Sequence, residues 1–259
     1  MSLTDSQLNE LLEIATTAIL AAGKIIAQYQ GQVIETELKK GGTSLASKVV
    51  TEIDSKAENA ILDILTPTLK AYNLGLLSEE TIDDNSRFEK PYFWCIDPLD
   101  GTLLFTQNQE GYSASIALVN QEGEAVIGIV YDPRNDNLYS AIKGKGAIKN
   151  GQPFYIDNKE KDVTIINGAG GAVMQAIATL ELAPCLFYKK PKTDEGGGCL
   201  WDYAASSVIH TEAGGLNSDY SFKPLNLNSS ETVFMNNHGV IYSAGLSEKS
   251  VKLLLAENN

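Results

Sequence analysis

The sequence lacks paired cysteines and long apolar runs, and this narrows what the protein can be. Its 259 residues include three cysteines and two histidines, and no two cysteines have a C-x-x-C spacing. A disulfide framework or a cysteine-histidine zinc site is therefore not expected. No apolar stretch approaches the ~20 residues of a membrane helix, and the N-terminus lacks the basic start and apolar run of a secretory signal. We expect a cytoplasmic protein that does not enter a membrane.

Basic charge is also scarce. Lysine and arginine total 20 against 33 aspartates and glutamates, which gives a formal net charge of −13. Such a surface repels phosphate backbones, so binding to a nucleic-acid polymer is not expected. Neither the G-x-S-x-G turn of serine hydrolases nor the G-x-x-x-x-G-K-[ST] phosphate loop occurs. If the ligand is an anion, divalent metal ions held by carboxylates would have to offset the acidic field.

Hydrophobic periodicity predicts helices and strands in the first half of the chain. Residues 5–29 and 51–70 have apolar side chains at helical spacing, and both predict amphipathic helices. Short apolar runs at Leu74–Leu77 and Tyr92–Ile96 predict strands, each of which ends in acidic residues. The pattern favours an α+β fold of layered helices and sheets.

The second half alternates more, with a predicted helix at Tyr203–Thr211 and a predicted late strand at Val233–Phe234. A polar stretch at residues 152–162 separates the two halves. We expect an N-terminal α+β half, residues 1–155, that carries most of the candidate metal ligands. The C-terminal α/β half, residues 156–259, would complete the site.

Two acidic groups come directly after the two predicted strands. Glu79-Glu80 follows the first strand, and Asp97 and Asp100 follow the second. Pro98 fixes one backbone angle between the two aspartates, so this short loop has a restricted shape. A helix cap or turn would explain either aspartate alone, and a solvated loop face would explain Glu79-Glu80. Two aspartates in a constrained loop, with a second acidic pair at a nearby strand end, favour a metal site.

The segment Asp97–Thr102 reads D-P-L-D-G-T and resembles the D-P-[IL]-D-G-T motif of the inositol monophosphatase superfamily. Val50–Asp54 is similar to the family's T-x-x-D helix start, and Leu77–Glu80 to its [GS]-E-E element. Trp201–Ala205 followed by Thr211–Gly215 is similar to its W-D-x-A…E-A-G-G element. The resemblance implies a layered αβαβα sandwich of the sugar-phosphatase type, a magnesium-dependent phosphoric monoester hydrolase, lithium inhibition and a homodimer.

The resemblance also implies roles for single residues. Two or three Mg²⁺ ions would be held by oxygen atoms of Glu79, Asp97, Leu99 (through its carbonyl), Asp100 and Asp202, with Asp97 bridging two ions. The catalytic residues would be Glu79, Thr102 and Asp54. The Thr102 hydroxyl and the Asp54 carboxylate would help to deprotonate the attacking water. Gly101 and Thr102 would offer backbone N–H groups to the substrate phosphate. Glu195, seven residues before Asp202, would contact a substrate hydroxyl.

The expected substrate is a small phosphorylated metabolite. After D-G-T the inositol enzymes commonly read T-N-F, whereas this chain reads Leu103–Phe105 as L-L-F. This difference and the Ser-Glu-Glu form of the acidic element favour a 3′(2′),5′-bisphosphate nucleotidase that converts adenosine 3′,5′-bisphosphate to AMP. Inositol 1-monophosphate is the alternative. Lys189, Lys190 and Lys192 could meet a second phosphate, although a solvated lysine run is the ordinary interpretation.

Two other classes of protein stay open. Gly168–Val173 follows a predicted strand and opens a predicted helix, as a dinucleotide-binding loop of an NADP-binding oxidoreductase would. The G-x-G-x-x-G fingerprint is incomplete, because Val173 stands in the place of the third glycine. A non-catalytic relative that only binds a partner is the second alternative, and the full set of acidic residues argues against it.

Overall fold

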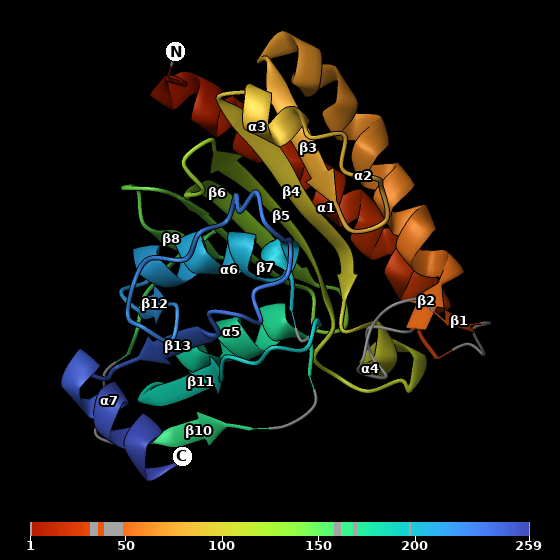
Figure 1. Cartoon of the computed structure of the whole chain (residues 1–259). Coiled ribbons are helices and arrows are strands. Elements are labelled where there is room, and N and C mark those ends of the chain that lie inside the picture. Colours follow the sequence, from red (N-terminus) through yellow and green to blue (C-terminus); the bar gives the residue numbers. More distant parts are fainter. Residues whose placement is uncertain are drawn as a thin grey trace.

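The computed structural model describes residues 2–31, 36–38, 49–157, 162–167, 170–196 and 198–258. These residues form five layers in which helices and sheets alternate (Figure 1). This arrangement confirms the predicted layered αβαβα sandwich. None of the described helices combines the length and the hydrophobicity that a membrane span requires.

The first layer is a pair of helices, α1 (Asp5–Tyr29) and α2 (Glu52–Ala71). Thr4 caps α1, because its side chain accepts a hydrogen bond from the backbone N–H of Gln7 at 3.3 Å. The apolar stripes of both helices pack on one face of the larger sheet. A short ribbon, β1 (Thr36–Leu38) with β2 (Val49–Thr51), precedes α2. Two acidic side chains of α2, Asp54 and Glu58, are buried.

The second layer is a seven-stranded sheet in the order β3-β4-β5-β6-β7-β8-β9. Only β3 and β4 run parallel, and every other neighbouring pair is antiparallel. The strands are β3 (Leu74–Ser78), β4 (Tyr92–Asp100), β5 (Ser113–Asn120), β6 (Ala125–Asp132), β7 (Asn137–Ile142), β8 (Ala147–Lys149) and β9 (Gln152–Phe154). Two short helices interrupt the succession, α3 (Ser86–Glu89) and α4 (Thr102–Thr106). The parallel pair brings the carboxyl ends of β3 and β4, and thus both acidic groups, to one edge of the sheet.

The pairing of β4 with β5 is irregular where the candidate ligands lie. The register is regular from Tyr92 to Asp97 and shifts between Asp97 and Asp100. Pro98 falls in this interval, and a proline has no N–H to donate to a strand ladder. Such bulges commonly re-aim side chains next to active sites. The constrained loop predicted from the proline is therefore a bulge inside a strand that continues to Asp100.

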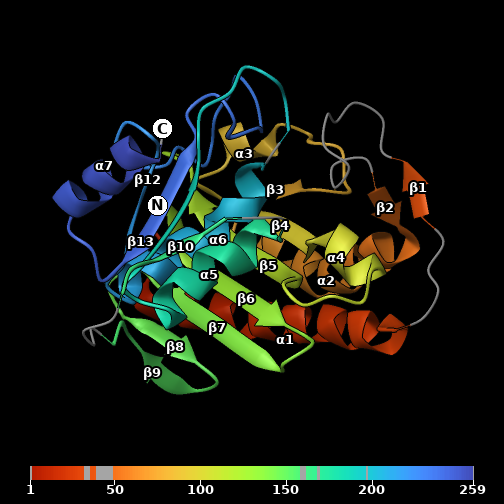
Figure 2. The same ribbon diagram turned by 90° about the horizontal axis from the view of Figure 1, so that it is seen from below.

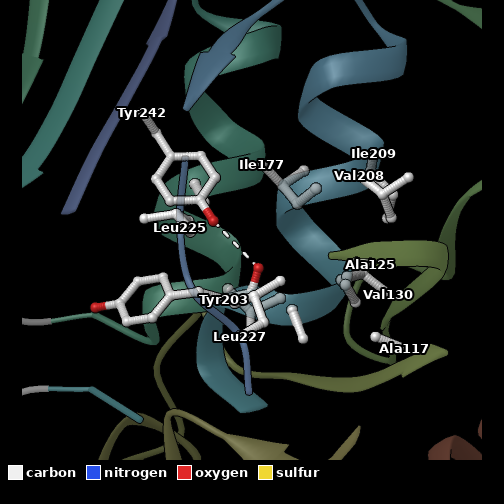
Figure 3. Packing of buried hydrophobic residues seen from close by; sticks show 14 of the residues in the cluster. Ala117, Ala125, Val130, Ile177, Tyr203, Val208, Ile209, Leu225, Leu227 and Tyr242 are labelled. Carbon is white, nitrogen blue, oxygen red and sulfur yellow. Dashed lines mark hydrogen bonds between the residues drawn. The ribbon is translucent and has the colours of Figure 1, made fainter. Parts of the chain in front are cut away.

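The third layer is made of α5 (Ala172–Glu181) and α6 (Leu200–Glu212), which pack between the two sheets. Figure 3 shows the core here, where the hydroxyl of Tyr242 donates to the carbonyl of Tyr203 at 3.2 Å. Gly128 on β6 lets α6 approach closely, because a Cβ at that position would overlap the carbonyl of Ala205. This packing fixes the position of the helix that carries Asp202.

The last two layers are a four-stranded sheet and helix α7 (Glu248–Glu257) (Figure 2). The strand order is β10-β11-β13-β12, with β10 and β11 parallel and the other pairs antiparallel. The strands are β10 (Thr164–Ile166), β11 (Cys185–Lys189), β12 (Leu216–Ser218) and β13 (Val240–Ala244). Buried residues of both sheets belong to one hydrophobic cluster. The predicted division at residue 155 falls between the last strand of the larger sheet and the first strand of the smaller one, and it stays a prediction.

Two predictions in the second half were wrong in detail. Val233–Phe234 is not a strand, because only Phe234 forms an isolated bridge, to Cys199. The helix predicted from Tyr203 begins at Leu200. Asp202 consequently lies inside the first turn of α6, where its side chain can reach both the helix start and the sheet edge.

Candidate metal centre

Three aspartates from two distant segments meet at the edge of the larger sheet. Asp97 and Asp100 lie at the end of β4, and Asp202 lies in the first turn of α6. Each of the three offers a carboxylate oxygen, and these oxygens all lie within 4.8 Å of one another. Two of the three side chains, Asp97 and Asp100, are buried. Like charges held this close in a protein interior are costly unless a cation lies among them or some of them are protonated.

Asp97 lies at the centre of the acidic group. Its Oδ1 accepts a hydrogen bond from the backbone N–H of Leu99 at 3.0 Å. Its Oδ2 is buried and receives no hydrogen bond from any group within the described ranges. Burial raises the pKa of Asp97 well above its usual value, and the charges of Glu79, Asp100 and Asp202 raise it further. An acceptor oxygen that is buried without a donor, among carboxylates, suits a cation.

Asp100 receives both of its strong hydrogen bonds from a helix far away in the sequence. The backbone N–H groups of Ala172 and Val173, at the start of α5, donate to its two oxygens at 3.1 and 2.9 Å. A Cβ at Gly171 would overlap the Asp100 carboxylate, so glycine is needed for this approach. Burial raises the pKa of Asp100 to about 8, with Asp202 adding to the effect, while the two N–H groups oppose it. Asp100 does cap a helix, but the helix is α5 and not the neighbouring α4.

The contact of Asp100 with α5 bears on the dinucleotide alternative. In a dinucleotide fold the first N–H groups of this helix would face a pyrophosphate. Here two of them face a carboxylate of the same chain, and Gly168 and Ala169 lie outside the described residues. An anionic cofactor at this helix start would have to displace the Asp100 side chain from these N–H groups. The observed contacts therefore argue against an NADP site at α5.

Asp202 also has a local structural partner. Its side chain accepts a hydrogen bond from the backbone N–H of Cys199, the N-cap residue of α6. Asp202 thus forms part of a capping box at the start of α6. A carboxylate has about four acceptor positions on its two oxygens, so capping and ion binding do not exclude each other.

Glu79 is held next to Asp97 by the pairing of β3 with β4. Ser78 lies opposite Ile96 in the parallel register, and the backbone N–H of Glu79 donates to the carbonyl of Ile96 at 3.2 Å. The Glu79 carboxyl group reaches that of Asp97, which raises the pKa of Asp97. The structure thus brings all four predicted carboxylate ligands to one place.

A buried glutamate that the sequence did not single out as part of the site organises the Glu79 segment. Glu58, one turn after Asp54 on α2, accepts hydrogen bonds from the hydroxyl of Ser78, the backbone N–H of Glu80 at 3.2 Å and the hydroxyl of Thr81 at 3.0 Å. These contacts fix the backbone on both sides of Glu79. The signal in the sequence was the spacing of four residues between Asp54 and Glu58, which places the two side chains on one side of α2.

The Thr102 hydroxyl and the Asp54 carboxylate meet as the resemblance implies. The two oxygens, Oγ1 of Thr102 and Oδ1 of Asp54, are 3.2 Å apart, and the same hydroxyl lies 3.0 Å from the carbonyl of Leu99. A hydroxyl has one proton, so it donates to one of these acceptors at a time. Gly101 precedes α4 with a φ of 82°, a conformation that glycine adopts without strain. The N–H groups at this helix start have no partner within the helix itself.

Glu195 lies on an exposed segment between β11 and α6. The neighbouring Asp194 accepts, through its carbonyl, a hydrogen bond from the side chain of Asn236 at 3.0 Å. Among the described side chains, Glu195 is not part of the group of aspartates whose oxygens meet. Its predicted contact with a substrate hydroxyl stays a prediction.

The acidic centre makes the stability of the metal-free protein depend on pH. Because Asp97 and Asp100 have raised pKa values when folded, the folded protein keeps protons that the unfolded chain has released, and its stability falls as pH rises toward about 8. His210 acts in the opposite direction, because burial lowers its pKa to about 3 and stability therefore rises with pH while the unfolded histidine loses its proton. This rise is nearly complete above ~6.5, the pKa of histidine in the unfolded chain. We expect the unfolding free energy of chelator-treated protein to fall by about 2 kcal/mol between pH 6.5 and 8.

Chemical denaturation at several pH values measures this dependence. Saturating Mg²⁺ should remove most of it, because ion binding stabilises the ionised folded state. A metal-free protein whose stability is constant or rises over the same range would contradict the predicted repulsion.

Comparison with known proteins points to one family. The family model described as the inositol monophosphatase family matches residues 7–193. The inositol-1-monophosphatase of Synechocystis sp. is 30% identical over 255 residues, which cover 89% of this chain and 86% of that protein. Nus factor SuhB of Escherichia coli (strain K12) is 28% identical over 238 residues, covering 83% of this chain and 86% of that protein. In three dimensions, a Thermotoga maritima IMPase matches with a TM-score of 0.74 and 25% identity over 98% of this chain and 100% of that one.

Proposed function

Because the chain belongs to the inositol monophosphatase family of phosphoric monoester hydrolases, we propose that it removes phosphate from a small metabolite with the help of Mg²⁺. The observation that carries this proposal is the meeting of Asp97, Asp100 and Asp202, with a buried oxygen of Asp97 that no described group satisfies. Carboxylate and carbonyl oxygens are the ligands that Mg²⁺ prefers. The chain has all the oxygen donors that its resemblance to the family implies.

The ligands proposed for two or three Mg²⁺ ions share their position at the edge of the larger sheet. They are the carboxylates of Glu79, Asp97, Asp100 and Asp202 and the carbonyl of Leu99. When bound, the ions would lower the pKa of the nucleophilic water and neutralise charge on the phosphate oxygens. The protein's own part is to hold these donors close together against their repulsion, through Leu99 N–H, the start of α5 and Cys199 N–H.

Thr102 and Asp54 form the proposed path for a proton. The Thr102 hydroxyl can accept a hydrogen bond from the attacking water while it donates to Oδ1 of Asp54, 3.2 Å away. Glu79, which interacts with Asp97, would assist at the same point. The backbone N–H groups of Gly101 and Thr102 would bind the phosphate at the start of α4, where the helix favours an anion. Glu195 would contact a hydroxyl of the substrate.

The proposed substrate is adenosine 3′,5′-bisphosphate, with inositol 1-monophosphate as the second candidate. The lysines at the end of β11 and just after it favour a substrate with two phosphates, because they bring positive charge to a chain of net charge −13. The relative from Escherichia coli is named a Nus factor, which suggests a partner-binding role for that protein. For this chain the intact set of acidic donors favours catalysis.

A substrate panel tests both levels of the proposal. We expect Mg²⁺-dependent release of phosphate, with kcat/KM for adenosine 3′,5′-bisphosphate about tenfold or more above that for inositol 1-monophosphate and fructose 1,6-bisphosphate, and inhibition by millimolar lithium. Colorimetric phosphate determination, with and without a chelator, measures the release of phosphate from each substrate. Equal release with the chelator would refute the metal proposal. A preference for inositol 1-monophosphate would support the phosphatase activity but contradict the proposed nucleotide substrate.

A cytoplasmic location and a homodimer are part of the same proposal, by analogy with the family. Multi-angle light scattering at micromolar concentration distinguishes the dimer from a monomer.

A further inference from the structure

A pocket lined by three lysines lies next to the start of α6, the helix that carries Asp202. It has a volume of about 300 Å³, and its lining includes Lys189, Lys190, Lys192, Tyr203 and Asn236. We call it the lysine pocket. Tyr203 follows Asp202 directly on α6, so one wall of the pocket continues from the residue proposed as a metal ligand. The three lysines differ in their contacts.

Strand alternation directs Lys189 toward the metal centre. Side chains of β11 point alternately to its two faces. Phe187 belongs to the core between the two sheets, whereas Leu186 and Tyr188 pack with α7 on the outer face. Lys189 therefore shares the inner face with Phe187, where α5 and the start of α6 lie (Figure 1).

Lys190 also lines the pocket, but its ammonium group has a structural partner outside it. Its ammonium group donates to the carbonyl of Asn258, just after α7, at 2.9 Å. A lysine at a helix C-terminus interacts favourably with the exposed carbonyls there. The ordinary interpretation of the lysine run holds for this residue.

Among the residues that the structure describes, Lys189 has no such partner. Within the described residues, no carboxylate lies within salt-bridge distance of its ammonium group. Its ammonium group lies over the ring of Phe187, 5.9 Å from the centroid. Its charge nevertheless acts on Asp100. Burial has the largest effect on the pKa of Asp100 and raises it, and Lys189 acts against this rise.

The backbone around Lys189 is fixed. Lys189 pairs with Val240 in the antiparallel register of β11 and β13. A Cβ at Gly239 would come within 2.5 Å of the carbonyl of Lys189. The Asn236 side chain donates to the carbonyls of Lys192 and Asp194, both at 3.0 Å. The pocket wall is thus held in place before a ligand arrives, which lowers the entropic cost of binding.

We propose, on the basis of the phosphatase function above, that the lysine pocket binds a second phosphate group of the substrate and that Lys189 is its main contact. The scissile phosphate would occupy the metal centre, and the second phosphate would lie between the ammonium groups of Lys189 and Lys192. An unpaired cation beside a strongly acidic site selects substrates that carry a negative charge away from the reacting group. Substrates with one phosphate would leave the pocket without an anion.

Steady-state kinetics of Lys189→Gln, with Lys249→Gln as the matched control, test the proposal. Lys249 is an exposed lysine of α7 that does not line the pocket. For Lys189→Gln we expect KM for adenosine 3′,5′-bisphosphate to rise about tenfold or more, with kcat nearly unchanged. KM for adenosine 2′-monophosphate should change less than about threefold. Lys249→Gln should leave the kinetics of both substrates unchanged, and Lys189→Arg, which keeps the charge, should retain most of the preference.

A binding measurement separates failure of the pocket from failure of the phosphatase. Calorimetric titration of adenosine 3′,5′-bisphosphate into Asp54→Asn protein, with Mg²⁺, should show a Kd that the added Lys189→Gln raises about tenfold. If Kd and KM do not change, the pocket is not the second phosphate site, even though phosphate release may continue. If no substrate of the panel is hydrolysed, the proposed function fails while the titration still decides the pocket.

Discussion

Replacement of Asp97 by asparagine is expected to lower kcat by roughly three orders of magnitude at saturating Mg²⁺. Asp97 is the carboxylate at the centre of the group, and its buried Oδ2 is the oxygen that lacks a donor. An amide keeps the shape of the side chain but supplies one neutral acceptor oxygen in place of two charged ones. Mg²⁺-dependent phosphate release, measured over a range of Mg²⁺ concentrations, should show the loss of both affinity and turnover.

The same substitution should stabilise the protein when no metal is present. Removing one of several neighbouring buried carboxylates relieves their repulsion. We expect the melting temperature of the chelator-treated variant to rise by several degrees, and Mg²⁺ to raise it further by much less than in the parent protein. This opposite effect on activity and stability separates a metal ligand from a residue that only supports the fold.

Asp63→Asn is a suitable control, because Asp63 is an exposed residue of α2 and the change removes the same charge. It should alter neither kcat nor the response of the melting temperature to Mg²⁺. An Asp97→Asn protein that hydrolyses substrate as fast as the parent would remove Asp97 from the proposed ligands. A variant that loses activity and also unfolds earlier without metal would assign Asp97 a structural role.

The sequence predicts most of what depends on neighbours along the chain. The amphipathic stripes of α1 and α2 are long enough to show helical spacing, so both helices were predicted almost to their ends. Asp97 and Asp100 could be assigned to one loop because a proline restricts the backbone between them. The three-residue strands β9 and β12 are too short to show alternation, and neither was predicted.

Contacts between distant segments explain what sequence reasoning missed. Asp100 is held by backbone N–H groups of residues 172 and 173, more than 70 positions later. Glu58 holds the segment around Glu79 from another element. Backbone N–H donors are the same in every residue, so no residue type marks them in a sequence. The same holds for Lys189, whose separation from Lys190 follows from strand alternation only once the ends of β11 are known.

The hydroxyl of Thr102 and the carboxylate of Asp54 should behave as one unit in catalysis. Asp54 is 1% exposed and lies 3.2 Å from the hydroxyl. The second acceptor near this hydroxyl is the carbonyl of Leu99, at 3.0 Å. If that carbonyl binds an ion, as proposed, the hydroxyl proton is left to Asp54, and the oxygen of Thr102 can then accept from water. Substitution of either residue alone should therefore abolish the function that the two share.

A double-mutant cycle measures this coupling. We expect Thr102→Val and Asp54→Asn each to lower kcat by about 10²-fold to 10³-fold with little change in KM, because a positioned proton acceptor contributes on this scale. The double variant should be no more than about tenfold slower than either single one, since residues that act together are not additive. Thr102→Ser keeps the hydroxyl and should retain most of the activity. Losses that multiply in the double variant would show that the two side chains act independently. In that case the 3.2 Å contact would belong to the fold and not to a proton path, because two residues of one path cannot have independent effects on kcat.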